Sequence, residues 1–280
     1  MKQFLVFLLL ALGDLVAAQS GASQFTPRPL KHTFYVIWGY NRSYYRDSDI
    51  AFKGEGYDFK LKGVQAIDDP EPFSPDVYFN PSKFTIPQFN FRVGFHIKEN
   101  LSISLGWDHM KYVMRAPQVA IMDGSIDPEL SWRYGRDYTN EPIVVNPDLL
   151  LYEHTDGLNF VRLGSEAHAP FWSGAHQRLQ LGVLLGINAG LVMPWTDVTF
   201  LEERQATRLH LAGWGASASL GFRLKWRNTF FLQYQVQPGY LDLRNILLQD
   251  HGPARAKQKI WFTELSLTAG AYVSVFKRKG

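Results

Sequence analysis

Long segments of this 280-residue chain alternate apolar and polar residues with a period of two. In residues 88–97, Phe, Val and Ile hold the odd positions, and Gln, Asn, Arg, Gly and His hold the even ones. The same alternation returns near residues 101–107, 179–191, 213–224, 229–237 and 261–275. A period of two places the two kinds of side chain on opposite faces of a β-strand. The sequence therefore predicts an all-β protein.

Three features indicate that the apolar face points outward, into lipid. The polar face is rich in Gly, Ser and Gln rather than in Lys and Glu. Many alternating segments reach the ~9–11 residues that a tilted strand needs to cross a bilayer. Aromatic residues such as Trp107, Trp195 and Trp261 recur near the segment ends, as in interfacial girdles. We expect a transmembrane antiparallel up-and-down β-barrel, with an exported soluble β-protein as the alternative.

The alternation also predicts a number of strands. The alternation places nine strands, and a bacterial barrel with both ends in the periplasm needs an even number. Proline-rich residues 68–87 contain the candidate for a further strand, at 76–86. We expect about 10 strands, with 8–12 open. The nine strands are expected near residues 33–45, 57–67, 88–97, 101–113, 149–163, 179–193, 211–224, 229–240 and 259–276.

The N-terminus has the pattern of an export signal. Lys2 precedes the apolar run 4–12, and the small residues 16–18 form a cleavage box. We expect a signal peptide at 1–18 cut near Ala18, a short tether at 19–30 and an outer-membrane β-barrel at 31–280. Cysteine is absent, which excludes thiolate metal sites and disulfides. The net charge of +3 gives no reason to expect nucleic-acid binding.

Four blocks resemble a family of uncharacterised outer-membrane β-barrel proteins from the Bacteroidetes. They are residues 38–42 (WGYNR), 57–59 (YDF), 108–113 (DHMKYV) and 154–159 (HTDGLN). The resemblance implies a barrel in the outer membrane of a Gram-negative cell and implies no particular activity. The chain departs from many barrels at its end, where Lys277-Arg278-Lys279-Gly280 follows Phe276 in place of a terminal aromatic residue.

The most polar part of any expected strand is residues 153–159. A bulge at Gly157 would turn these side chains inward at the upper rim, or some of them would face lipid headgroups. Three interpretations stay open: a structural polar network, a metal or headgroup site, and a catalytic site. The metal candidates are Glu153, Asp156 and Asn159.

The catalytic interpretation rests on a similarity to the outer-membrane lipid A deacylases, which carry a His-x-Ser pair on a barrel strand. His154 matches their base, and Glu166 or Glu153 is placed to orient it. Asp156 stands at the nucleophile position and has no hydroxyl, so the ester-cleaving mechanism does not carry over. The sequence thus favours a protein without catalytic activity and predicts no cofactor.

The leading hypothesis is a porin-like integral outer-membrane barrel with a structural, surface-binding or narrow transport role. Inward-facing Arg92, His96, Arg223 and Glu264 are expected to form a charge ladder in a filled lumen. Asp108 is expected at the strand top, in a rim salt bridge. The alternatives are a lipid-modifying enzyme and an accessory barrel of an envelope complex. Expected partners are outer-membrane lipid and lipopolysaccharide, and envelope proteins docking on loops 111–148 and 242–257.

Overall fold

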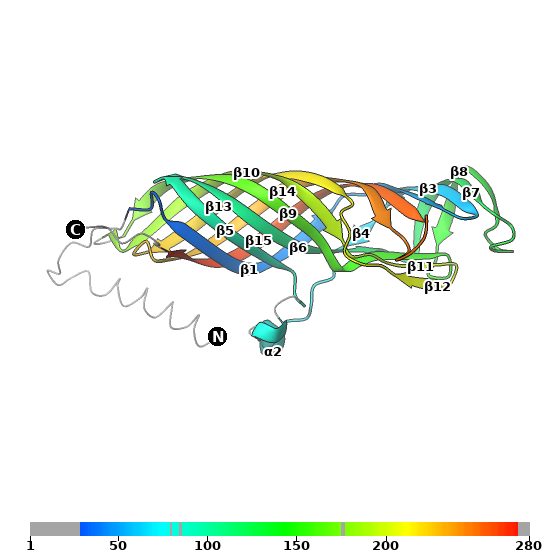
Figure 1. Cartoon of the computed structure of the whole chain (residues 1–280), viewed down its shortest axis with the longest axis horizontal. Helices are drawn as coiled ribbons and strands as arrows, with labels where there is room; N and C mark the ends of the chain where they lie inside the picture. The colour runs from blue at the N-terminus through cyan, green and yellow to red at the C-terminus, as the bar shows by residue number, and fades with distance from the viewer. Residues whose placement is uncertain (1–28, 79, 84–85, 175–176, 274–280) are drawn as a thin grey trace.

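Eight antiparallel strands close into a ring in the computed structural model (Figure 1), which describes residues 29–78, 80–83, 86–174 and 177–273. The first and last ring strands pair along twelve residues, from Phe34 with Val273 to Tyr45 with Phe262. Each ring strand also pairs with the next ring strand in the chain, so the barrel is up-and-down. The ring strands are β1 (Phe34–Tyr45), β5 (Phe89–Lys98), β6 (Leu101–Met114), β9 (Leu150–Ser173), β10 (Leu179–Pro194), β13 (Gly213–Trp226), β14 (Phe230–Leu247) and β15 (Arg255–Val273).

The ring has eight strands, so the favoured count of ten is too high, while eight lies within the expected range of 8–12. Residues 57–67 form β3 (Tyr57–Val64) and β4 (Ala66–Ile67), which lie outside the ring. Alternation predicts a strand correctly here but cannot say which sheet neighbours it will have. The described residues of 76–86 form no strand. They contribute to α2 (Pro75–Tyr78) and η2 (Pro81–Lys83), in keeping with prolines that cannot donate to a sheet.

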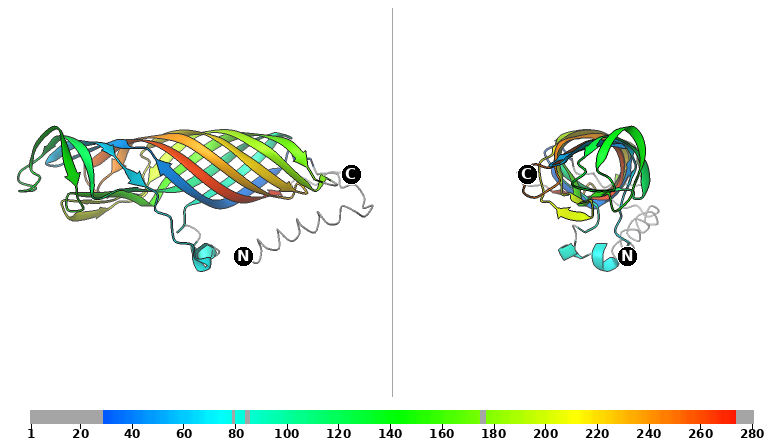
Figure 2. Two further views of the ribbon diagram at one scale, coloured as in Figure 1. Left: turned by 180° about the vertical axis from the view of Figure 1, so that it is seen from behind. Right: turned by 90° about the vertical axis from the view of Figure 1, so that its right-hand side faces the viewer.

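The remaining strands build an extension beyond one end of the ring (Figures 1 and 2). β2 (Ser48–Gly54) pairs with the upper part of β15, and β3, β7 (Gln118–Ile126) and β8 (Arg136–Val145) continue that sheet in order. A hairpin of β11 (Asp197–Phe200) and β12 (Glu203–Ala206) pairs with β9. We call these strands, with the upper ends of the ring strands, the extension.

Two predicted loops are therefore mostly β-structure. The link 111–148 contains the β7–β8 hairpin, and 242–257 is largely the ends of β14 and β15. Short turns join β5 to β6 and β13 to β14 at the end of the ring opposite the extension, where β1 begins and β15 ends (Figure 1). Short turns face the periplasm in barrels of this kind, so the extension faces outward from the cell. The expected signal peptide at 1–18 lies outside the described residues.

The polarity of the sheet inverts between the ring and the extension. Around the ring, exposed apolar side chains such as Leu163, Ile187 and Leu267 cover the outside, while polar side chains fill the inside. In the extension, a buried apolar core that includes Ile50, Phe59 and Met122 fills the inside. The outside of the extension carries ion pairs in contact with water. They include Lys53–Asp58, Lys60–Asp49, Arg136–Glu141, Arg204–Asp197 and Arg208–Asp250. Among the described residues, no helix is long and apolar enough to cross a membrane.

Candidate functional site

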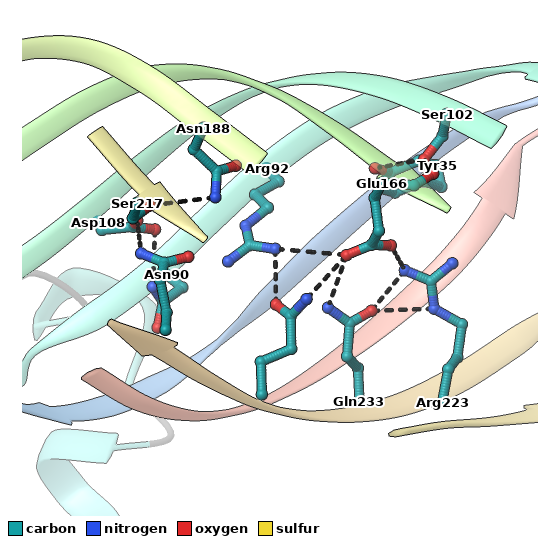
Figure 3. Close-up of polar contacts among 12 residues, drawn as sticks. Tyr35, Asn90, Arg92, Ser102, Asp108, Glu166, Asn188, Ser217, Arg223 and Gln233 are labelled. Atoms are coloured by element: carbon teal, nitrogen blue, oxygen red, sulfur yellow. Dashed lines mark hydrogen bonds and ion pairs between the residues drawn. The ribbon is translucent and has the colours of Figure 1, made fainter. Parts of the chain in front are cut away.

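The lumen of the ring holds a network of buried polar side chains (Figure 3). Its outer layer centres on the ion pair between Arg162 on β9 and Asp108 on β6, whose side chains are both 0% exposed. The Arg162 Nε lies 2.5 Å from an Asp108 carboxylate oxygen, and Asn90 donates to the other oxygen at 2.7 Å. Asn90 also donates to Glu264 at 2.8 Å, and Gln237 donates to Asp108 at 3.1 Å.

The second layer centres on Glu166, nearer the periplasmic turns. Arg223 on β13 forms an ion pair with the Glu166 carboxylate, and Gln235 donates to it at 2.8 Å. Arg92 lies 3.9 Å from the same carboxylate and donates to the Gln235 carbonyl oxygen at 2.8 Å. Figure 3 shows Arg92 and Arg223 pointing at Glu166 from opposite sides. Six ring strands, β5, β6, β9, β13, β14 and β15, thus contribute to the two layers through side chains that bond one another.

Together the two layers combine three arginines with three carboxyl groups, all buried. An eight-stranded barrel is just narrow enough for side chains to fill its interior. Charged groups removed from water need oppositely charged or hydrogen-bonding partners, and Arg162–Asp108 and Arg223–Glu166 provide them for each other. The arrangement therefore fills the centre of the barrel with buried charged groups, although some of their atoms, among them Arg92 Nη2 and Glu264 Oε2, have no hydrogen-bond partner.

The structure confirms part of the sequence-based lumen and corrects another part. Arg92, His96, Arg223 and Glu264 are all buried, as predicted. Asp108 is not in a rim salt bridge, because its strand continues six residues beyond it to Met114 and carries it inside the barrel. Arg162 was not singled out from the sequence. The signal for it was its phase, since it alternates with Gly164 and Glu166 on the inward face.

The predicted site at 153–159 is divided by a bulge. Three residues, 155–157, lie opposite the single residue Lys111, between the pairs His154–Tyr112 and Leu158–Met110. Gly157 has φ +133°, a conformation that favours glycine, and a Cβ there would lie 2.6 Å from the Asn159 side chain. The bulge leaves His154 buried and Asp156 exposed on the same strand.

The candidate residues consequently meet different partners. His154 Nε2 lies 3.1 Å from the Tyr152 hydroxyl, while Glu166 belongs to the second lumen layer with Arg223. Glu153 accepts a hydrogen bond from Thr155 at 3.1 Å. The Asn159 side-chain oxygen lies 2.8 Å from both Trp107 Nε1 and His109 Nδ1. Within the described part of the chain, no three His, Asp or Glu side chains are grouped for a metal ion.

A cavity of about 210 Å³ lies in the extension, at the far end from the turns. Tyr57 and Phe200 form part of its wall, with ring centroids 4.6 Å apart. Burial raises the pKa of the Tyr57 phenol, which therefore stays a neutral hydroxyl in ordinary conditions. This cavity could not be predicted from the sequence, because its wall comes from several separate segments. Its other lining residues are Phe52, Glu55, Leu130, Leu150, Val198, Leu201, Glu203, Gln205, Leu248 and Gln249.

A closed antiparallel ring with an apolar outside and a polar inside is the inverse of a water-soluble barrel. In lipid every backbone polar group needs a partner within the protein, and a closed ring supplies one for each strand. Apolar outer faces bounded by girdle tryptophans such as Trp107, Trp214 and Trp261 belong to barrels of the bacterial outer membrane. The fold and its surface define an integral outer-membrane β-barrel protein.

Solved structures of small outer-membrane proteins are similar to this chain at low identity. The protein AlkL, solved in lipid bilayers, is 12% identical with a TM-score of 0.44, covering 94% of this chain and 100% of AlkL. OprG of Pseudomonas aeruginosa is 12% identical with a TM-score of 0.42, covering 90% and 99%. Neisserial surface protein A is 10% identical with a TM-score of 0.37, covering 85% and 96%. No known protein family matches the sequence, and no curated protein matches it.

Proposed function

We propose that this protein is a closed outer-membrane barrel that acts by binding at the cell surface. In this proposal the ring anchors the protein in the membrane and does not conduct. The extension, which stands in water, is the working part. The observation that carries the proposal is the filled lumen, in which Arg162–Asp108 and Arg223–Glu166 cross the barrel interior as buried pairs.

The cavity in the extension supports a binding role and suggests the ligand chemistry. Its wall combines aromatic and aliphatic side chains with four polar ones, Glu55, Glu203, Gln205 and Gln249. A cavity of about 150 Å³ lined by apolar side chains is large enough to bind benzene. We therefore propose a small apolar group, free or carried by a larger surface ligand, as the occupant.

The other hypotheses are retained with less support. The lipid-modifying alternative needs His154 and Asp156 to act together, and their opposite burial does not favour it. Narrow transport requires the lumen pairs to separate, and an accessory role requires a partner for the β7–β8 hairpin. Membership of the Bacteroidetes barrel family, export by cleavage near Ala18 and contact with lipopolysaccharide remain proposals.

Planar-bilayer recording tests the closed barrel directly. The purified full chain should show no steady open-channel current, whereas a trimeric porin inserted in the same bilayer should conduct. The double variant Arg162→Ala/Asp108→Ala removes the outer pair and should raise the rate of brief openings. A steady current from the unaltered protein would reject the proposal and favour narrow transport.

A binding assay tests the cavity. Its probe is an apolar fluorescent amine, N-phenyl-1-naphthylamine, and the protein is held in detergent above the critical micelle concentration. Phe200→Arg should reduce saturable binding by about tenfold, because a charged side chain would occupy the apolar wall. Val119→Arg is the matched control, since Val119 is exposed in the extension and does not line the cavity. Equal binding by both variants would place the probe in the micelle and remove the cavity from the proposal.

A further inference from the structure

An aromatic row marks the outer boundary of the lipid-facing surface on one side of the barrel. Trp214, Tyr240 and Trp261 lie on three adjacent strands, β13, β14 and β15. Their rings are neighbours, with centroids 6.0 Å apart for Trp214–Tyr240 and 4.8 Å for Tyr240–Trp261. Trp261 is 57% exposed, so the row faces outward. Trp and Tyr in such positions sit at the level of lipid headgroups.

Two lysines follow this row on the outward face of β15. Lys259 and Lys257 are exposed and lie two and four residues beyond Trp261, toward the extension. A strand rises about 3.4 Å per residue, so the two side chains begin roughly 7 and 14 Å past the indole along the strand. Among the described residues, neither lysine is in an ion pair. They are therefore available cations at and just above headgroup level.

The same two lysines line a groove of about 740 Å³ on the outer surface, together with Arg244 and Lys60. The groove also contains carboxylates, and two of them are already neutralised. Arg244 Nε lies 2.8 Å from the Asp242 carboxylate, and Lys60 Nζ lies 2.7 Å from Asp49. Asp47 is the remaining acidic lining residue. With these pairs formed, the unpaired charges of the groove are two lysines against one aspartate.

We infer that this groove binds the phosphate group of a lipid in the outer leaflet, with Lys257 and Lys259 as its principal ligands. The aromatic row beneath the lysines contacts the glycerol or sugar region, and the apolar ring surface below it contacts the acyl chains. A lipid is favoured over a free anion because the cations stand directly above a membrane-facing surface. The site is separate from the apolar cavity and does not depend on that ligand.

Lipid titration followed by native mass spectrometry tests the site on the full chain in detergent. The probes are lipid A with two phosphates and the same lipid A after dephosphorylation. The intact protein should prefer the phosphorylated form, and Lys257→Gln/Lys259→Gln should weaken its binding by about tenfold or more, since each lysine near a membrane surface contributes severalfold. Asp242→Asn removes a carboxylate from the groove and should strengthen binding.

The matched control is Lys53→Gln/Lys62→Gln, which removes two lysines of the extension that lie outside the groove. This control should change binding by less than about twofold, because both lysines lie outside the groove and each is paired with an aspartate. If both double variants weakened lipid A binding equally, the effect would depend only on net charge, and this result would overturn the inference. Equal binding of dephosphorylated lipid A would overturn it as well, and displacement by millimolar inorganic phosphate would reassign the groove to free anions. All variants should first show the intact protein's heat-modifiable gel migration.

Discussion

The ring and the extension are continuous parts of one sheet, yet they place apolar residues on opposite faces. In the ring, Leu220 points outward and Arg223 points inward, and in the extension Lys60 points outward and Leu61 points inward. Both arrangements use the same period of two. The difference shows that the alternation indicates only that the two faces of a strand meet different environments. Whether the apolar face points inward or outward depends on whether that part of the sheet stands in water or in lipid.

The change of solvent also changes what holds each region together. In the extension, burial of apolar surface away from water is the main favourable contribution. In lipid this contribution is absent for the outward side chains, and backbone pairing and the lumen network remain. Arg162–Asp108 and the exposed Arg136–Glu141 pair of the extension are therefore the most informative pair to compare.

The largest expected effect is on the lumen pair. Arg162→Leu leaves the Asp108 carboxylate buried without its cation and should lower the free energy of unfolding by about 3–5 kcal/mol. Arg136→Leu breaks an exposed, solvent-screened pair and should have a much smaller effect on the free energy of unfolding. Urea unfolding in lipid vesicles measures both. The double variant Arg162→Leu/Asp108→Leu should cost less than Arg162→Leu alone, and a larger cost would contradict the buried-charge explanation.

A second comparison places the same substitution on two exposed apolar residues. Leu220 on the ring is 52% exposed, and Val119 on the extension is 64% exposed. Leu220→Lys puts a charge into lipid and should cost about 2–4 kcal/mol. Val119→Lys puts one into water and should change stability by less than about 0.5 kcal/mol. Similar costs at the two positions, measured by the same unfolding assay, would place the membrane boundary elsewhere on the sheet.

The smallest expected effect concerns Asp68, in the connection between β4 and α2. Burial raises the pKa of the Asp68 carboxyl, although the Ser43 amide and the Gln88 side chain donate to it. A raised pKa means that the folded state holds the proton more tightly, so this group lowers stability as the pH rises through that range. Asp68→Asn should flatten the pH dependence of urea unfolding between acidic and neutral pH. An unchanged profile would exclude Asp68 as its source.

The sequence predicted all eight ring strands, because each has a long lipid-facing run with an opposite polar face, although it ended the strand of β9 at 163 rather than at Ser173. It overestimated the ring because β3 alternates just as clearly, although its polar face meets water. The extension strands β7 and β8 were missed for a related reason. Both strands interrupt the alternation, β7 at Asp123-Gly124-Ser125 and β8 at Asn140-Glu141-Pro142, so period alone did not separate them from a loop.

The candidate site was harder to predict than the fold. Residues 153–159 drew attention by their polarity, and the bulge at Gly157 was anticipated, but its effect on each side chain depends on register. The lumen pair Arg162–Asp108 joins two strands whose register the sequence does not specify. The cavity and the lysine groove depend on segments far apart in the chain, and only the folded sheet brings these together.

The pairing of β1 with β15 has a consequence for how the barrel is made. This seam joins the first and last ring strands, so no closed ring exists until the end of the chain is in place. Until then both strands present unpaired backbone groups, which lipid cannot satisfy. Contacts between such distant segments also form slowly, because a long loop must close first. Insertion and closure are therefore coupled, and a chain shortened within β15 would be left as an open sheet that the membrane does not accept.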